Sequence, residues 1–92
     1  MVLTDTSLLA WQEIEATVND RQQAVLSALQ GVDDATNTEL STILGWSINR
    51  ITPRVKELRD KGLVVCAGIR ECRVTGRRVY AWEWRKQYGN RP

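Results

Sequence analysis

Apolar side chains recur at helical spacing through the first two thirds of the chain. Apolar residues three or four positions apart predict one helix over residues 7–18 and a second over residues 20–30. Asn19 suits the cap of the second helix because Gln22 stands three residues later, which is the spacing of a capping box. The pattern therefore predicts two consecutive helices at the start of the domain.

Two further helices are expected close together, over residues 38–44 and 47–61. Either Thr36 or Asn37 suits the cap of the first, and Ile43 is expected to point inward. Gly45 stands where that helix would end. Apolar residues then recur from Ile48 onward at helical spacing, so only a tight turn separates the two helices.

Pro53 lies inside the last of these helices, where a proline costs roughly 3 kcal/mol. Two interpretations are open. Either Ser47 caps the helix and the chain is distorted around Pro53, or Thr52 is the cap and Pro53 takes the favoured first position. The apolar stripe that begins at Ile48 favours a start near Ser47.

The hydrophobic period changes after Gly62. The run at residues 63–66 and the β-favouring residues 78–84 predict two antiparallel strands within a hairpin over residues 63–84. The basic, glycine-punctuated residues between them, 68–77, are expected to form a long loop. The fold class expected is α+β, four helices followed by a two-stranded β-hairpin, with residues 85–92 as a tail.

Composition narrows the chemistry. The 92 residues, numbered 1–92, suffice for a single domain, and the absence of histidine removes His-based acid–base catalysis and His-containing zinc sites. The two cysteines, Cys66 and Cys72, are expected to be reduced thiols. No catalytic set, metal site or phosphate-binding glycine loop is visible, so we expect neither an enzyme nor a cofactor. No stretch is apolar enough to span a membrane, and no signal peptide is visible, which predicts a cytoplasmic protein.

Charge is strongly divided along the chain. Residues 1–48 carry one basic and seven acidic side chains, whereas residues 49–92 carry twelve basic and four acidic ones. The first half therefore has a net charge of −6 and the second half of +8. Such polarity in a small domain suggests that one face meets a polyanion.

Residues 36–84 resemble winged helix-turn-helix proteins, most closely MarR-type regulators and small winged-helix proteins of bacterial viruses. The resemblance is carried by the run E-L-x-x-x-L-G at residues 39–45 and by R-V-K-E-L-x-x-K-G-L-V at residues 54–64. It implies a double-stranded DNA-binding protein in which the hairpin is the wing. It also implies a small prokaryotic or phage transcription regulator, in the bacterial cytoplasm or an infected host cell.

The expected mechanism places helix 47–61 in the major groove and residues 68–78 on the flanking backbone or minor groove. Asn49 suits adenine, and Arg50 or Arg54 suits guanine, because these pairs match in donor and acceptor pattern. The candidate DNA-binding residues are Thr38, Ser47, Asn49, Arg50, Thr52, Arg54, Lys56, Arg70, Arg73, Thr75, Arg77 and Arg78. A homodimer formed through helix 7–18 would double the number of base pairs read.

Two other functions are open. The hairpin or its tryptophans would instead bind a protein, as in a phage-encoded inhibitor or a replication or recombination accessory. Alternatively, Tyr80 and Trp82 would stack on single-stranded DNA or RNA. Fold resemblance alone does not decide among these functions.

Overall fold

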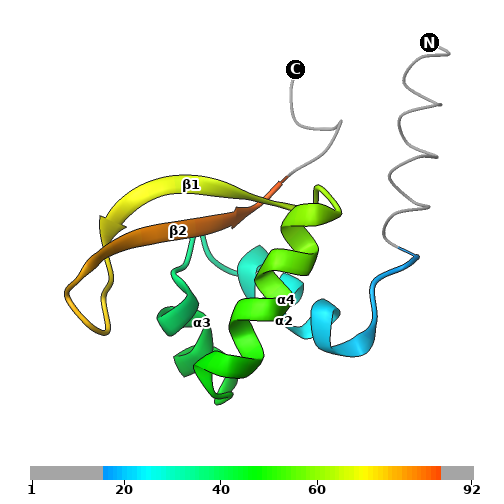
Figure 1. Ribbon diagram of the computed structural model, residues 1–92, viewed down its shortest axis with the longest axis horizontal. Helices are drawn as coiled ribbons and strands as arrows, with labels where there is room; N and C mark the ends of the chain where they lie inside the picture. Colours follow the sequence, from blue (N-terminus) through cyan, green and yellow to red (C-terminus); the bar gives the residue numbers. More distant parts are fainter. Residues whose placement is uncertain (1–15, 86–92) are drawn as a thin grey trace, which may run out of the picture.

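The structure is a computed structural model that describes residues 16–85. Three helices pack together, and a long hairpin passes along one side of them with its tip bent down beside the second helix (Figure 1). The elements in chain order are α2 (Asp20–Gln30), α3 (Asn37–Leu44), α4 (Ile48–Asp60), β1 (Val64–Glu71) and β2 (Arg78–Trp84).

The helices agree closely with the sequence-based expectations. The bounds of α2 match the prediction, α3 begins one residue earlier than predicted, and α4 is one residue shorter at each end. The predicted helix 7–18 falls mainly outside the described residues, but Ala16 and Thr17 form a turn and Val18 is not helical. The described part of the chain thus holds three helices, where four were expected for the whole.

Capping explains where α2 and α3 begin. The backbone N–H of Gln22 donates to Asn19 Oδ1 at 2.8 Å, and Asn19 N–H donates to Gln22 Oε1 at 3.1 Å, as predicted. Thr36 and Glu39 form the same reciprocal pair at the start of α3, which decides for Thr36 over Asn37 as the cap. Gly45 ends α3 with φ of 71°, a conformation that favours glycine.

Pro53 lies within α4, the sixth residue of a helix that begins at Ile48. The start near Ser47 is therefore confirmed, and Thr52 is not the cap. The side chain of Ser47 makes no capping hydrogen bond. It stays exposed beside the first turn of α4.

Side chains from all three helices and the hairpin form one core. Its members are Val25, Leu26, Leu29, Ala35, Leu40, Ile51, Val55, Leu58, Leu63, Val64 and Trp82. Ile43 and Ile48 were expected to point inward, but they are 52% and 41% exposed. Ile43 is not part of the core; it lines a pocket together with Arg73 and Val74 of the wing tip. Ile48 is the first residue of α4, before the helix reaches the core.

The first strand is longer than expected. It continues to Glu71, so residues 68–71, predicted as loop, pair with β2 in the register Gly68↔Ala81 to Glu71↔Arg78. A bulge between Cys66 and Gly68 shifts the register, and Gly68 has φ of 118° there. The hydrophobic pattern missed this half of the strand because most of it is exposed and needs no apolar alternation.

Candidate nucleic-acid interface

The outward face of α4 is polar and basic. Ile51, Val55 and Leu58 are buried against the core, which turns the opposite side of the helix to solvent. The exposed residues along its first two turns and at its cap are Ser47, Ile48, Asn49, Arg50, Thr52, Pro53 and Lys56. No acidic side chain occurs between Trp46 and Lys56. Such a face suits the donor and acceptor pattern of the major groove.

Arg50 is held in place by an aromatic ring. Its guanidinium carbon lies 4.6 Å from the centroid of the Trp46 ring, a cation–π contact. Trp46 is half-buried and packs against the core, so its ring is a fixed support. The Ser41 hydroxyl donates to the Trp46 carbonyl and closes the turn between α3 and α4. The contact with Trp46 thus restricts the direction in which the Arg50 side chain extends from α4.

Arg54 is engaged within the protein. Its Nε and Nη2 donate to the Glu57 carboxylate at 2.8 and 2.7 Å, and Glu57 also accepts from Gln22 Nε2 at 2.8 Å. The pair raises the pKa of Arg54 and lowers that of Glu57. The Arg54 side chain is 21% exposed and is paired within α4, whereas Glu57 links α4 to Gln22 of α2.

Lys56 is in a looser pair. Its Nζ lies 3.1 Å from Asp60 Oδ2, and both side chains are about two thirds exposed, at 69% and 66%. Exposed pairs of this kind contribute little and exchange easily with other partners. Lys56 is therefore available to a phosphate in a way that Arg54 is not.

The start of α3 lies against the middle of α4. Asn37 Nδ2 donates to Thr52 Oγ1 at 3.4 Å. Thr38 is half-buried, and its carbonyl accepts from the Thr42 hydroxyl at 3.2 Å. The first turn of α3, which contains Thr38, therefore lies beside Thr52 of α4.

The tip of the wing, residues 72–77, is short and carries exposed arginines. Cys72 N–H donates to the Arg77 carbonyl and Gly76 N–H donates to the Cys72 carbonyl, both at 2.8 Å. The Thr75 hydroxyl accepts from Arg77 N–H at 3.2 Å. Arg73 has a side chain 74% exposed, and Thr75, Arg77 and Arg78 are exposed as well.

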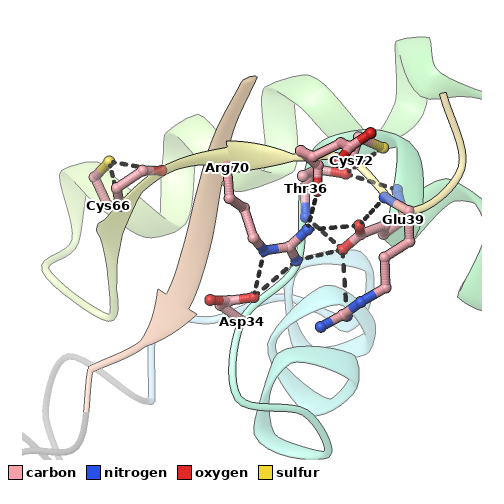
Figure 2. A network of polar contacts seen from close by, with 9 residues as sticks. Asp34, Thr36, Glu39, Cys66, Arg70 and Cys72 are labelled. Carbon is pink, nitrogen blue, oxygen red and sulfur yellow. Dashed lines mark hydrogen bonds and ion pairs between the residues drawn. The ribbon is translucent and has the colours of Figure 1, made fainter. Parts of the chain in front are cut away.

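Arg70, in contrast, points back toward the helices. Figure 2 shows its guanidinium between Asp34 and Glu39. Its Nε and Nη2 donate to Asp34 Oδ1 at 2.9 and 2.7 Å. Its Nη1 and Nη2 donate to the two Glu39 oxygens at 2.8 and 2.6 Å. We call these three residues, Asp34, Glu39 and Arg70, the ion-pair cluster.

Glu39 is the most perturbed carboxylate of the described residues. Its side chain is 7% exposed, and hydrogen bonds from Arg70, Arg73 N–H and Thr36 N–H outweigh its burial and lower its pKa from 4.5 to about 2. Hydrogen bonds to Glu39 and Asp34 raise the pKa of Arg70. The carboxylate is therefore ionised at neutral pH and fully matched by donors.

Cys72 lies beside the cluster. Its Sγ is 3.2 Å from Thr36 Oγ1. Burial raises the pKa of the thiol, but hydrogen bonds from Thr36, Thr75 and Val74 outweigh this and bring it to about 7. Both cysteines are free, in agreement with the thiols expected from the sequence. Cys66 is exposed and Cys72 is buried.

Two arginines are engaged in the tightest ion pairs. Glu39 pairs with Arg70, and Glu57 pairs with Arg54. Apart from Arg59, whose guanidinium lies over the Trp82 ring, the basic groups that remain exposed on α4 and near the tip are Arg50, Lys56, Arg73, Arg77 and Arg78. Sequence reasoning found all five but missed Trp46 as the support of Arg50. The available signal was the four-residue spacing between the aromatic Trp46 and the basic Arg50.

Other kinds of site find little support in residues 16–85. That part of the chain contains no group of three or more metal-ligating side chains. None of its helices is long and apolar enough to cross a membrane. Trp82 is 8% exposed with Arg59 at 4.5 Å from its ring, so it offers little surface for stacking on a base.

One comparison with known proteins matches this geometry. The family model of winged helix-turn-helix DNA-binding domains matches residues 18–65, which include α2, α3, α4 and the start of β1. The comparisons with curated proteins and with solved structures give no match. The matched segment covers more than half of the chain and contains the polar helix face described above. The chain therefore belongs to the winged helix-turn-helix DNA-binding family.

Proposed function

We propose that this protein binds double-stranded DNA sequence-selectively and acts as a small transcription regulator of a prokaryote or phage by occupying its site. The supporting observation is the exposed face of α4, where Asn49, Arg50 and Thr52 stand together without an acidic neighbour. An α-helix with this surface fits the major groove, and its first turns meet base edges.

The contacts divide by position. Asn49 and Arg50 read base edges, while Ser47 and Thr38 meet the adjoining phosphates. The DNA backbone or the minor groove beside that site is met by Arg73, Thr75, Arg77 and Arg78. Arg54 and Arg70 are not proposed as direct contacts, because both are engaged in ion pairs within the protein. The homodimer through helix 7–18 stays part of the proposal, and residues 7–15 of that helix lie outside the described residues.

The first test is fluorescence anisotropy with a labelled random-sequence duplex at several salt concentrations. If Lys56, Arg73, Arg77 and Arg78 each meet a phosphate, log K falls against log salt with a slope of about −3.6. A matched single strand competes much less well than duplex. Failure to bind duplex at low salt, or equal competition by the single strand, would contradict the proposal.

A charge-matched pair of variants separates groove contact from general attraction. Arg50→Gln removes a contact of α4, whereas Arg21→Gln removes the same charge from an exposed position on α2. Arg50→Gln is expected to weaken specific binding roughly tenfold or more, as the loss of a base contact does. Arg21→Gln is expected to leave it nearly unchanged, and equal losses would mean that α4 does not read the DNA.

A further inference from the structure

The hairpin is tied at several points to the three residues that precede α3, Asp34, Ala35 and Thr36. Asp34 accepts from Arg70 of β1, and Thr36 Oγ1 contacts Cys72 Sγ at 3.2 Å. Between them, Ala35 N–H donates to the Trp82 carbonyl at 2.9 Å and Trp82 N–H donates back at 2.8 Å, like a third strand beside β2. Each of these residues therefore holds a different point of the hairpin.

Glu39 extends these ties to the tip. Its Oε2 accepts from Arg73 N–H at 2.7 Å, and its Oε1 accepts from Thr36 N–H at 3.1 Å. The same carboxylate thus caps α3, pairs with Arg70 and holds the first arginine of the tip. Because α3 packs directly on α4, the position of the tip is linked to that of the helix proposed to read DNA.

Arg70 has no free donor. A guanidinium has five N–H groups, and this one makes five hydrogen bonds, four to Asp34 and Glu39 and one to the Glu71 carbonyl. Its side chain is 24% exposed, against 74% for Arg73. A phosphate contact by Arg70 would require breaking short, charge-assisted bonds that the cluster already satisfies.

We propose that Arg70 is a positioning residue: its bridge to Asp34 and Glu39 fixes the wing tip so that Arg73 and Arg77 reach the DNA backbone in register with α4. Arg70 itself does not touch the DNA. This inference rests on the proposed function, because it assigns a role within DNA binding.

The proposal is tested by whether DNA binding becomes tighter or weaker when the two acidic charges of the cluster are removed. Asp34→Asn with Glu39→Gln removes two negative charges near the proposed interface while every arginine is retained. Simple electrostatics, or a phosphate contact by a released Arg70, predicts tighter DNA binding. The positioning role predicts the opposite, because the tip loses its fixed place.

We expect the double variant to bind duplex roughly tenfold more weakly at about 0.1 M salt, with a salt slope reduced by one to two units. Asp33→Asn is the matched control, since Asp33 is exposed, adjacent to Asp34 and outside the cluster. That variant should bind as well as the wild type or slightly better. Tighter or unchanged binding by the double variant would overturn the proposal.

A second mutation distinguishes loss of position from loss of fold. In the wild type, Arg73→Gln should weaken binding, whereas in the double variant the same change should cost little further, because the tip no longer delivers that side chain. Additive losses would overturn the proposal. If the double variant unfolds, Glu39→Gln alone replaces it, because glutamine keeps the capping box of α3.

A DNA-independent readout separates this inference from the proposed function. Hydrogen exchange at Arg73 N–H should accelerate in the double variant but not in Asp33→Asn, since Glu39 accepts from that group at 2.7 Å. If exchange accelerates in the double variant but the wild type binds no duplex, the contact between Glu39 and the wing tip is supported. That outcome contradicts only the proposed DNA binding. Unchanged exchange in the double variant would overturn the positioning role.

Discussion

The stability of the fold at low pH should depend on Glu39 above other carboxylates. Its pKa falls from 4.5 to about 2 because Arg70 and two backbone N–H groups hydrogen-bond the ionised form. A shift of this size corresponds to about 3 kcal/mol of stabilisation, which is an upper limit because Arg70 and Asp34 remain partly open to water and screening weakens the pair. The carboxyl pKa is lowered in the folded state. The stabilisation is therefore complete above about pH 4.5, declines as the pH falls toward 2, and is absent below.

Urea unfolding followed by circular dichroism, at fixed ionic strength from pH 7 to pH 2, measures this effect. Glu39→Gln should be less stable than the wild type at pH 7, by up to about 3 kcal/mol, and the difference should vanish near pH 2. Glu57→Gln is a useful comparison, since Glu57 is more exposed and its pairing with Arg54 should contribute less. Parallel pH curves for the wild type and Glu39→Gln would refute the reasoning.

Three further predictions concern stability at neutral pH, each measured by urea unfolding. Pro53→Ala should stabilise α4 by about 1–2 kcal/mol, because alanine restores a backbone donor and outweighs the extra entropy of the unfolded chain; equal or lower stability would show that α4 accommodates the proline without cost. Gly45→Ala should cost about 1 kcal/mol, because φ is 71° there, and no loss would mean that the turn relaxes. Leu58→Ala should cost about 2–5 kcal/mol, because Leu58 is fully buried, whereas a loss below about 1 kcal/mol would contradict the core described here.

Local signals were enough to predict the helices. Asn19 with Gln22 and Thr36 with Glu39 each form a capping box within four residues, so the sequence alone contains both partners. Gly45 ends α3 through its own backbone freedom. Even the start of α4 could be predicted, because the apolar stripe continues N-terminal to Pro53.

Long-range contacts were beyond such reasoning. Arg70 lies 31 positions from Glu39 and 36 from Asp34, and no periodicity links them. The sequence therefore predicts a DNA contact for Arg70 and gives no sign of its pairing with Asp34 and Glu39. The second half of β1 could not be predicted from the basic, glycine-punctuated segment, because its side chains face mostly solvent and show no apolar alternation. Its strand conformation depends on pairing with β2.

The uneven charge of the chain has a structural explanation in these contacts. Asp34 and Glu39 belong to the acidic first half, and Arg70 belongs to the basic second half, so the two halves meet where β1 approaches the wing tip. Arg54 is similarly matched by Glu57 within α4. The excess of positive charge that the sequence shows is therefore reduced before any DNA arrives. What remains exposed is a smaller set on α4 and near the wing tip, in which the Trp46 ring supports the Arg50 guanidinium and Glu39 accepts from the backbone N–H of Arg73. In the proposed complex with DNA, an Arg50 side chain that is ordered in advance favours a matching site, because it loses less entropy on binding.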